Sequence, residues 1–261
     1  MATEALRLSV EELALILNHL GQPEAGRGIL TAQLGADLTQ EEVHARLMAS
    51  SHALMARGWL EIDSEGKITI DPNLVRATRI ITRPAFSLRY SYSTPEVEVL
   101  TTYHFGEGTI FEHFLEMGLV HNLVELSSQE EVIQRGIDFF QLALTPDFTC
   151  SDATVSNDVM NSVKDAKDQG TVLRKLQQAG IPEDTRLLLA EDIRTSLYRG
   201  SILRIEYGAD NAPQSNRGLL VLRGSQRLWL LRPVSRKETN LVHILPGTEH
   251  RFRQEVAELL K

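Results

Sequence analysis

The sequence contains an internal repeat, and this feature limits the possible folds more than any other. Residues 118–140, GLVHNLVELSSQEEVIQRGIDFF, resemble residues 240–260, NLVHILPGTEHRFRQEVAELL. The alignment pairs Leu119-Val120-His121 with Leu241-Val242-His243, and it pairs Ile133, Ile137 and Phe140 with Phe252, Val256 and Leu259. Just upstream, FGEGTIFEHF resembles LRGSQRLWLL. Because four elements recur in the same order, the repeat predicts two related halves.

Each half is predicted to contain helices first, then an antiparallel meander, then one helix. Near residue 85 the apolar period changes from 3.6 to 2, which is typical of strands. The predicted strands are FSLRYSYS, EVEVLTTYHF, TIFEHFL and LVHNLVEL, and, after a helical region at 151–198, SILRIEYG, RGLLVLRG, RLWLLRP and NLVHIL. We therefore predict an α+β fold in which helices flank an antiparallel sheet. Its two halves, residues 1–148 and 149–261, are expected to be related by pseudo-two-fold symmetry within a single globular unit.

Two capping boxes predict where helices start near the N-terminus. Ser9 with Glu12 opens the first helix, and Thr39 with Glu42 opens the second. Gly21 is expected to end the first helix, and a glycine-rich loop is expected to lead to the second.

The segment 39–70 is predicted to be a helix followed by a two-stranded hairpin, WLEI and KITI, with the acidic turn DSEG. A helix and a hairpin in this order are typical of a winged helix, so a DNA-binding transcriptional regulator is one alternative function. However, the helix offers only Arg46 and Arg57 as fixed positive charges, and the acidic turn repels phosphate. These features favour a structural helix–hairpin and no nucleic-acid partner.

No motif for catalysis, a metal or a cofactor is present. The formal net charge is −8, and Cys150 is the only cysteine. Cys150 precedes a predicted helix start, but no histidine is near it in the sequence. His113, His121 and His243 lie in predicted strands, where a hydrogen-bonded structural histidine is the usual case. An enzyme or small-ligand binder remains an alternative, which a deep pocket holding His113 or His121 with a carboxylate would support.

The second meander carries a basic cluster that is a candidate protein interface. Residues 199–253 contain ten Lys and Arg residues but only four Asp and Glu residues. An aromatic side chain flanked by arginines is the composition of an interface hot spot. It also fits a sheet with one buried face and solvated ends. The candidate interface residues are Arg223, Arg227, Trp229, Arg232 and Arg236.

The layout of nearly the whole chain resembles the EspG family, the cytosolic chaperones of type VII (ESX) secretion. LSVEELALILNHLG resembles the opening helix of that family. LMARGWLEIDSEGKITIDPNL resembles its segment in which a helix, a glycine, a short acidic turn and a later Pro-x-Leu follow in order. The duplicated α+β halves are also similar.

The resemblance implies a non-enzymatic chaperone or adaptor in the cytoplasm. Such a protein binds one end of a helical-hairpin client, covers its apolar tip and supports its delivery for secretion. No apolar run approaches the roughly 20 residues that span a bilayer, and no cofactor motif is present, so we expect no membrane partner and no cofactor. We expect the client to contact the basic second meander and the helices of residues 151–198.

Overall fold

The computed structural model describes residues 5–35, 38–164, 166, 168–208, 212–234 and 240–261. The chain divides into two compact units. The first unit comprises Met1–Ser87 and Thr101–Ser127, and the second comprises Leu88–Leu100 and Ser128–Lys261. This division differs from the sequence halves, because residues 88–100 and 128–148 group with the C-terminal unit. We describe each unit by itself.

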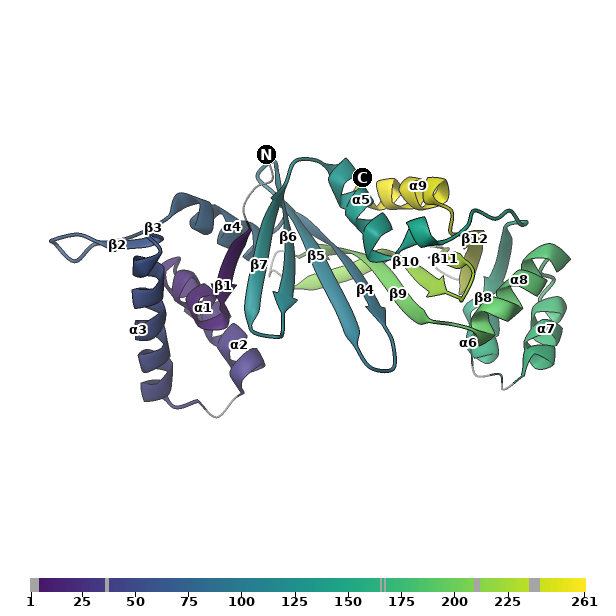
Figure 1. Cartoon of the computed structure of the whole chain (residues 1–261), viewed down its shortest axis with the longest axis horizontal. Helices are drawn as coiled ribbons and strands as arrows, with labels where there is room; N and C mark the ends of the chain where they lie inside the picture. The colour runs from purple at the N-terminus through teal and green to yellow at the C-terminus, as the bar shows by residue number, and fades with distance from the viewer. Residues whose placement is uncertain (1–4, 36–37, 165, 167, 209–211, 235–239) are drawn as a thin grey trace. The chain divides into compact units, whose positions relative to one another are not determined.

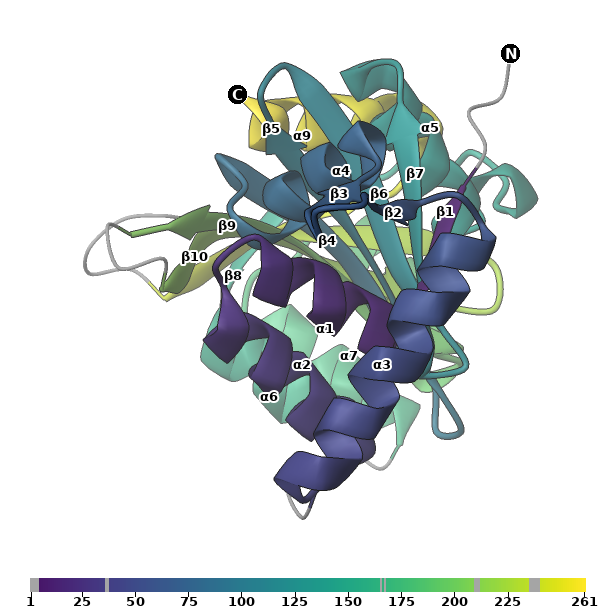
Figure 2. The ribbon, with the colours of Figure 1, turned by 90° about the vertical axis from the view of Figure 1, so that its left-hand side faces the viewer.

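The first unit combines helices with an antiparallel group of strands (Figure 1). Strand β7 pairs with β1 on one side and β6 on the other, and β6 pairs with β5. Figure 2 shows α1, α2 and α3 packed side by side. The elements are β1 (Leu6–Ser9), α1 (Val10–His19), α2 (Pro23–Leu34), α3 (Gln40–Ala56), β2 (Leu60–Ile62), β3 (Ile68–Ile70), α4 (Pro72–Thr82), β4 (Phe86–Ser93), β5 (Glu98–Gly106), β6 (Thr109–Glu116) and β7 (Val120–Leu126). Strands β4 and β5 extend into the second unit.

The second unit repeats this plan. Its strands pair antiparallel in the order β9-β10-β11-β12-β8, and α6, α7 and α8 lie together beside β8 (Figure 1). The elements are α5 (Gln129–Phe139), a 3-10 turn (Leu142–Leu144), β8 (Ala153–Ser156), α6 (Asn157–Lys164), α7 (Gln169–Gln178), α8 (Glu183–Arg194), β9 (Tyr198–Tyr207), β10 (Pro213–Arg223), β11 (Leu228–Pro233), β12 (Leu241–Pro246) and α9 (Glu249–Leu260). The predicted α+β class, with a large antiparallel sheet flanked by helices, is confirmed.

Several short elements were not expected from the sequence. The predicted glycine-rich loop after the first helix is wrong, because α2 occupies Pro23–Leu34. Gly26 lies where α2 packs closely on α1, since a Cβ there would be only 2.9 Å from the carbonyl oxygen of Ala14. The predicted helix start after Cys150 is also wrong, because β8 comes first and α6 begins only at Asn157.

The repeat is visible in the edge strand that precedes the first helix of each unit's helical group, α1 and α6. Strand β1 pairs antiparallel with β7 and ends at Ser9, whose side chain caps α1. Strand β8 pairs antiparallel with β12 and ends at Ser156, whose Oγ accepts a hydrogen bond from the backbone N–H of Val159 in α6. A four-residue edge strand that ends in a capping serine therefore introduces the helices of both units.

The pairing registers correct the residue alignment of the repeat by one position. His121 lies opposite Leu8 in the buried core of the first unit, on the face that α1 covers. Its counterpart on the covered face of β12 is Val242, which lies opposite Val155 in the core of the second unit. His243 follows Val242 and therefore points to the other face. The predicted equivalence of His121 and His243 is wrong, because a one-residue shift reverses the face of every side chain.

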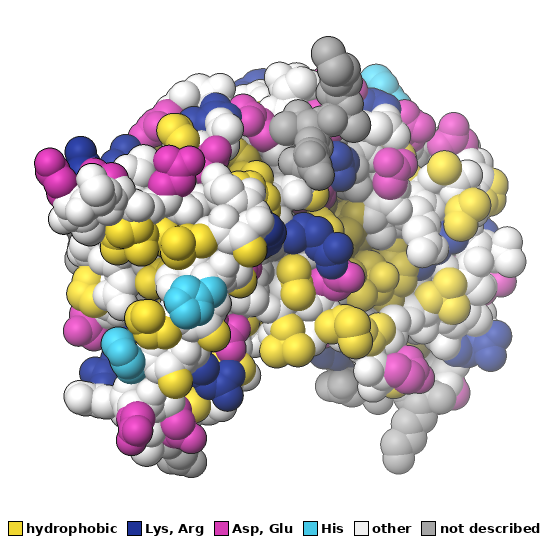
Figure 3. Space-filling view, turned by 60° about the vertical axis from the view of Figure 1, so that its left-hand side comes forward, with side chains coloured by type: hydrophobic (Ala, Val, Ile, Leu, Met, Phe, Trp, Pro, Cys, Tyr) yellow, Lys and Arg dark blue, Asp and Glu magenta, His cyan; other side chains and the backbone are white. Residues whose placement is uncertain are grey.

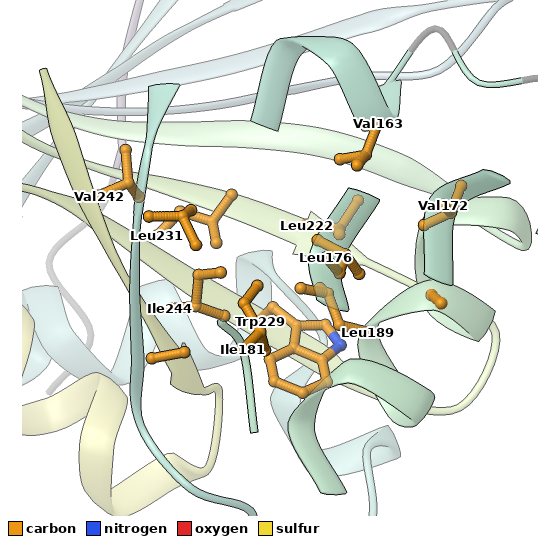
Figure 4. Close-up of a cluster of buried hydrophobic side chains, with 13 residues drawn as sticks. Val163, Val172, Leu176, Ile181, Leu189, Leu222, Trp229, Leu231, Val242 and Ile244 are labelled. Carbon is orange, nitrogen blue, oxygen red and sulfur yellow. The ribbon is translucent and has the colours of Figure 1, made fainter. Parts of the chain in front are cut away.

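The core of the second unit lies between its strands and α6, α7 and α8. Figure 4 shows Trp229 within this cluster, beside Ile181 and Leu189. The Phe148 ring packs edge-on against the Trp229 ring, with 5.0 Å between the ring centroids. Burial of this set of apolar side chains fixes the three helices on one face of the strands.

Candidate functional site

Trp229 is a core residue rather than an exposed interface residue. Its side chain has no exposed surface, and its indole Nε1 donates a hydrogen bond to Asp192 Oδ2 at 2.8 Å. Asp192 is equally buried on α8. The indole therefore attaches α8 to β11, and the prediction that Trp229 forms an interface hot spot is wrong.

The arginines of the predicted cluster have partners within the second unit. Arg227 contacts Asp192 through Nε at 2.7 Å and also contacts Glu191. Arg232 donates to both carboxylate oxygens of Glu255, at 2.9 and 3.0 Å. The Arg223 guanidinium is buried and donates to Thr145. The structure therefore does not gather these side chains into one exposed patch, and Arg236 lies outside the described residues.

An open apolar groove lies beside these residues in the second unit. Its volume is about 240 Å³. Helix α6 supplies Met160 and Val163, α8 supplies Ile193, and the strands supply Leu220, Leu222 and Leu231. Leu220 lies opposite Leu231 in the ladder between β10 and β11, so both side chains point to the same face.

Leu220 is the groove residue whose exposure is least expected from its position in the sheet. Its side chain is 43 % exposed, although it lies in the middle of β10 between two paired strands. Leu222, two residues further along, is buried in the core. The groove is therefore the place where the apolar face of the strands passes from the covered core to solvent. Sequence reasoning missed it, because the run GLLVL only indicates a buried strand.

Two positively charged side chains line the groove. Lys164 is the last residue of α6, and Arg199 lies on β9 opposite Leu222. In the part of the chain that the structure describes, the residues lining the groove include no carboxylate and no histidine. Its chemistry is therefore apolar contact with a positively charged rim, which Lys164 and Arg199 supply.

Three histidines form a row in the first unit. The His113 ring lies between those of His104 and His121, at centroid distances of 5.6 and 5.1 Å. His113 Nε2 and His121 Nδ1 share a hydrogen bond of 2.8 Å, and Ser87 Oγ bonds His104 Nδ1 at 2.9 Å. Burial lowers the pKa of His113 to about 3 and that of His121 to about 4.

Because their pKa values are lowered well below 7, His113 and His121 are neutral at physiological pH. His113 and His121 bond to each other rather than to a carboxylate, so the arrangement expected for an enzyme site is not formed. Among the residues that the structure describes, no group of three or more His, Cys, Asp or Glu could hold a metal ion. Cys150 is half-buried, and burial raises its pKa, which disfavours the reactive thiolate.

Both arginines of the helix–hairpin form ion pairs within the first unit. Arg46 forms an ion pair with Glu11 at 2.9 Å, and Arg57 forms one with Glu12. The Arg57 guanidinium also lies over the Trp59 ring, 4.1 Å from its centroid. Figure 3 shows hydrophobic, histidine and charged side chains intermixed on this side of the molecule. Arg46 and Arg57, the two fixed positive charges of the predicted helix, therefore connect α3 to α1 and to the hairpin.

No helix in the described ranges is both long enough and apolar enough to cross a bilayer. The fold is similar to that of a solved structure. The structure of the Mycobacterium tuberculosis type VII secretion system chaperone EspG5, in complex with a PE25–PPE41 dimer, matches with a TM-score of 0.68 and 14 % identity. The match covers 98 % of this chain and 96 % of that chain. The resemblance to the EspG family is thus confirmed at the level of the fold.

The sequence comparison identifies the family. The chain belongs to the YfjC family, described as "Uncharacterised protein YfjC", whose model matches residues 5–253. The YfjC protein of Bacillus subtilis (strain 168) is 21 % identical over an alignment of 241 residues, and the match covers 90 % of this chain and 93 % of that protein.

Proposed function

We propose that this protein is a non-enzymatic cytosolic chaperone or adaptor that binds the apolar end of a helical protein. The client is a helical hairpin, and the groove around Leu220 is the contact surface. One observation carries the proposal: an EspG-like fold leaves a strand-face leucine 43 % exposed in an apolar groove with a cationic rim. Covering an exposed apolar tip keeps a client of this kind from associating with itself.

The form of the groove favours a helix as the bound element. Strand β10 pairs with β9 and with β11, so its backbone groups beside the groove are occupied. An extended segment therefore finds no free sheet edge there. A helix satisfies its own backbone and presents only side chains, as in other helix-in-groove complexes.

The size of the groove favours side chains over a whole small molecule. Small-molecule sites usually enclose roughly 300–1,000 Å³ and contain a few convergent polar groups. The groove holds about 240 Å³ and is mainly apolar. Its dimensions fit a few aliphatic side chains of a partner helix.

Delivery of the client to a type VII secretion machinery is the second part of the proposal. The structural neighbour EspG5 is a chaperone of such a system and was solved with a PE25–PPE41 dimer. A fold can be kept while its client changes. The proposal therefore defines the client by its form, a helical pair with an apolar end.

The test is a pull-down from the native cells with tagged wild-type protein, Leu220→Glu and Leu187→Glu. Leu187 is a matched control because it is 50 % exposed on α8 and does not line the groove. A small helical protein should be retained by wild type and by L187E and lost with L220E. Equal retention by all three proteins contradicts the proposal. Capture that disappears after nuclease treatment supports the DNA-binding alternative instead.

A further inference from the structure

We infer that the groove selects a client helix that carries an acidic side chain beside its apolar face. This inference rests on the proposed function and specifies its partner. The groove is apolar on its floor and walls, and the charged side chains among its described lining residues, Lys164 and Arg199, are both cations.

The position of Arg199 directs its charge to the groove. In the ladder between β9 and β10, Arg199 lies opposite Leu222, so both side chains point to the same face. Ser201, two residues further along β9, lies opposite Leu220 on that face and bonds Ser91 Oγ at 2.8 Å. Arg199 is half-buried. Lys164 approaches the groove from a different element, the C-terminal end of α6.

Neither cation is neutralised by any residue that the structure describes. Two nearby arginines, by contrast, do have carboxylate partners. Arg227 in the β10–β11 turn pairs with Asp192, and Arg232 on β11 pairs with Glu255. A half-buried guanidinium without a carboxylate gains a charge-assisted hydrogen bond when a ligand supplies one. Arginine is suited to this role, since its planar fork binds both oxygens of a carboxylate.

The expected client segment follows from these two properties. Leucine, isoleucine or methionine side chains at helical spacing fill the groove, and a glutamate or aspartate about one turn away reaches Arg199 or Lys164. A basic residue at that position is rejected by like-charge repulsion. The rim therefore sets which helix binds, and the apolar floor supplies the contact area.

The experiment uses three helix-stapled, fluorescein-labelled amphipathic peptides with the same leucine face. They differ only in the two positions that flank this face, which are Glu, Gln or Lys. Anisotropy titrations with the full chain should give the affinity order Glu, Gln, Lys, with about tenfold or more between the first and the last. The difference should shrink as salt rises from about 50 mM to about 500 mM, because partly exposed charges are screened.

Charge reversal isolates the role of the rim. In the double variant Lys164→Glu with Arg199→Glu, the affinity order should invert. The matched control is Arg174→Glu with Arg186→Glu, which changes the net charge equally on helices outside the groove. The control should keep the wild-type order. Inversion in both double variants overturns the inference, because it shows a response to net charge alone.

The remaining outcomes separate this inference from the proposed function. Equal binding of the three peptides, lost in Leu220→Glu, overturns the charge selection and leaves the groove as a helix-binding site. Binding that is unaffected by Leu220→Glu, or no binding of any peptide, counts against the proposed function and against this inference together.

Discussion

The buried contact between Asp192, Arg227 and Trp229 gives a quantitative prediction about stability. Asp192 has no exposed surface, and its Oδ2 accepts from Arg227 Nε at 2.7 Å and from Trp229 Nε1 at 2.8 Å. The substitution Asp192→Asn keeps the shape and one acceptor oxygen but removes the charge. Arg227 is then left mostly buried beside Glu191 alone.

The magnitude follows from burial. A hydrogen bond to a charged group contributes about 1.5–3 kcal/mol, and a neutral acceptor restores about 1 kcal/mol of it. Loss of one partner from a buried ion pair adds the cost of an incompletely neutralised charge. We expect Asp192→Asn to lower the free energy of unfolding by about 2–3 kcal/mol. For a chain of this size, the midpoint of thermal unfolding should fall by about 5 °C or more.

Glu191→Gln is the matched control. Glu191 binds the same arginine, but its side chain is 45 % exposed. Exposed ion pairs contribute about 0–1 kcal/mol. The assay is urea and thermal unfolding of both variants, followed by circular dichroism and tryptophan fluorescence. Equal losses in the two variants refute the reasoning, because burial of Asp192 would then have no effect on the energy of the contact.

Three further predictions concern other parts of the chain. Gly224→Ala should lower stability by about 3 kcal/mol or more in urea unfolding, since its Cβ would lie 2.1 Å from Asp192 Oδ1; a loss under 1 kcal/mol contradicts this. Because the pKa values of His113 and His121 are lowered, the unfolded chain binds more protons below about pH 6.5. Stability should therefore fall as pH drops from 7 to 5.5, by up to about 1.4 kcal/mol per pH unit and histidine, and His113→Gln should reduce this slope. Leu220→Glu should change the unfolding free energy by less than about 1 kcal/mol, because the side chain is already half exposed, and a larger loss would show a core role.

Local signals in the sequence were sufficient for several elements. The capping boxes at Ser9 and Thr39 predict α1 and α3, and both are formed with reciprocal hydrogen bonds. Strands β2 and β3 form the expected hairpin, with the acidic turn between them. These features depend on residues within a few positions of one another, so they can be recognised without the fold.

Short and non-local features could not be predicted. Strands β1 and β8 have four residues each, which is too few to establish a period of two. Trp229 has the composition of an interface residue, and only its contact with Asp192, 37 positions earlier, shows that it belongs to the core. The groove combines α6, α8 and three strands, so the exposure of Leu220 depends on where those helices end.

The central claim is that a helical client occupies the groove at Leu220, and site-specific photo-crosslinking tests it most directly. A benzophenone amino acid is placed at position 220 in the full chain, and at position 187 as the control, in the native cells. The account predicts a crosslink from position 220 to an apolar helical segment of one small protein, and none from position 187. Crosslinking of the same protein from both positions with equal yield, or from position 187 alone, would contradict the account.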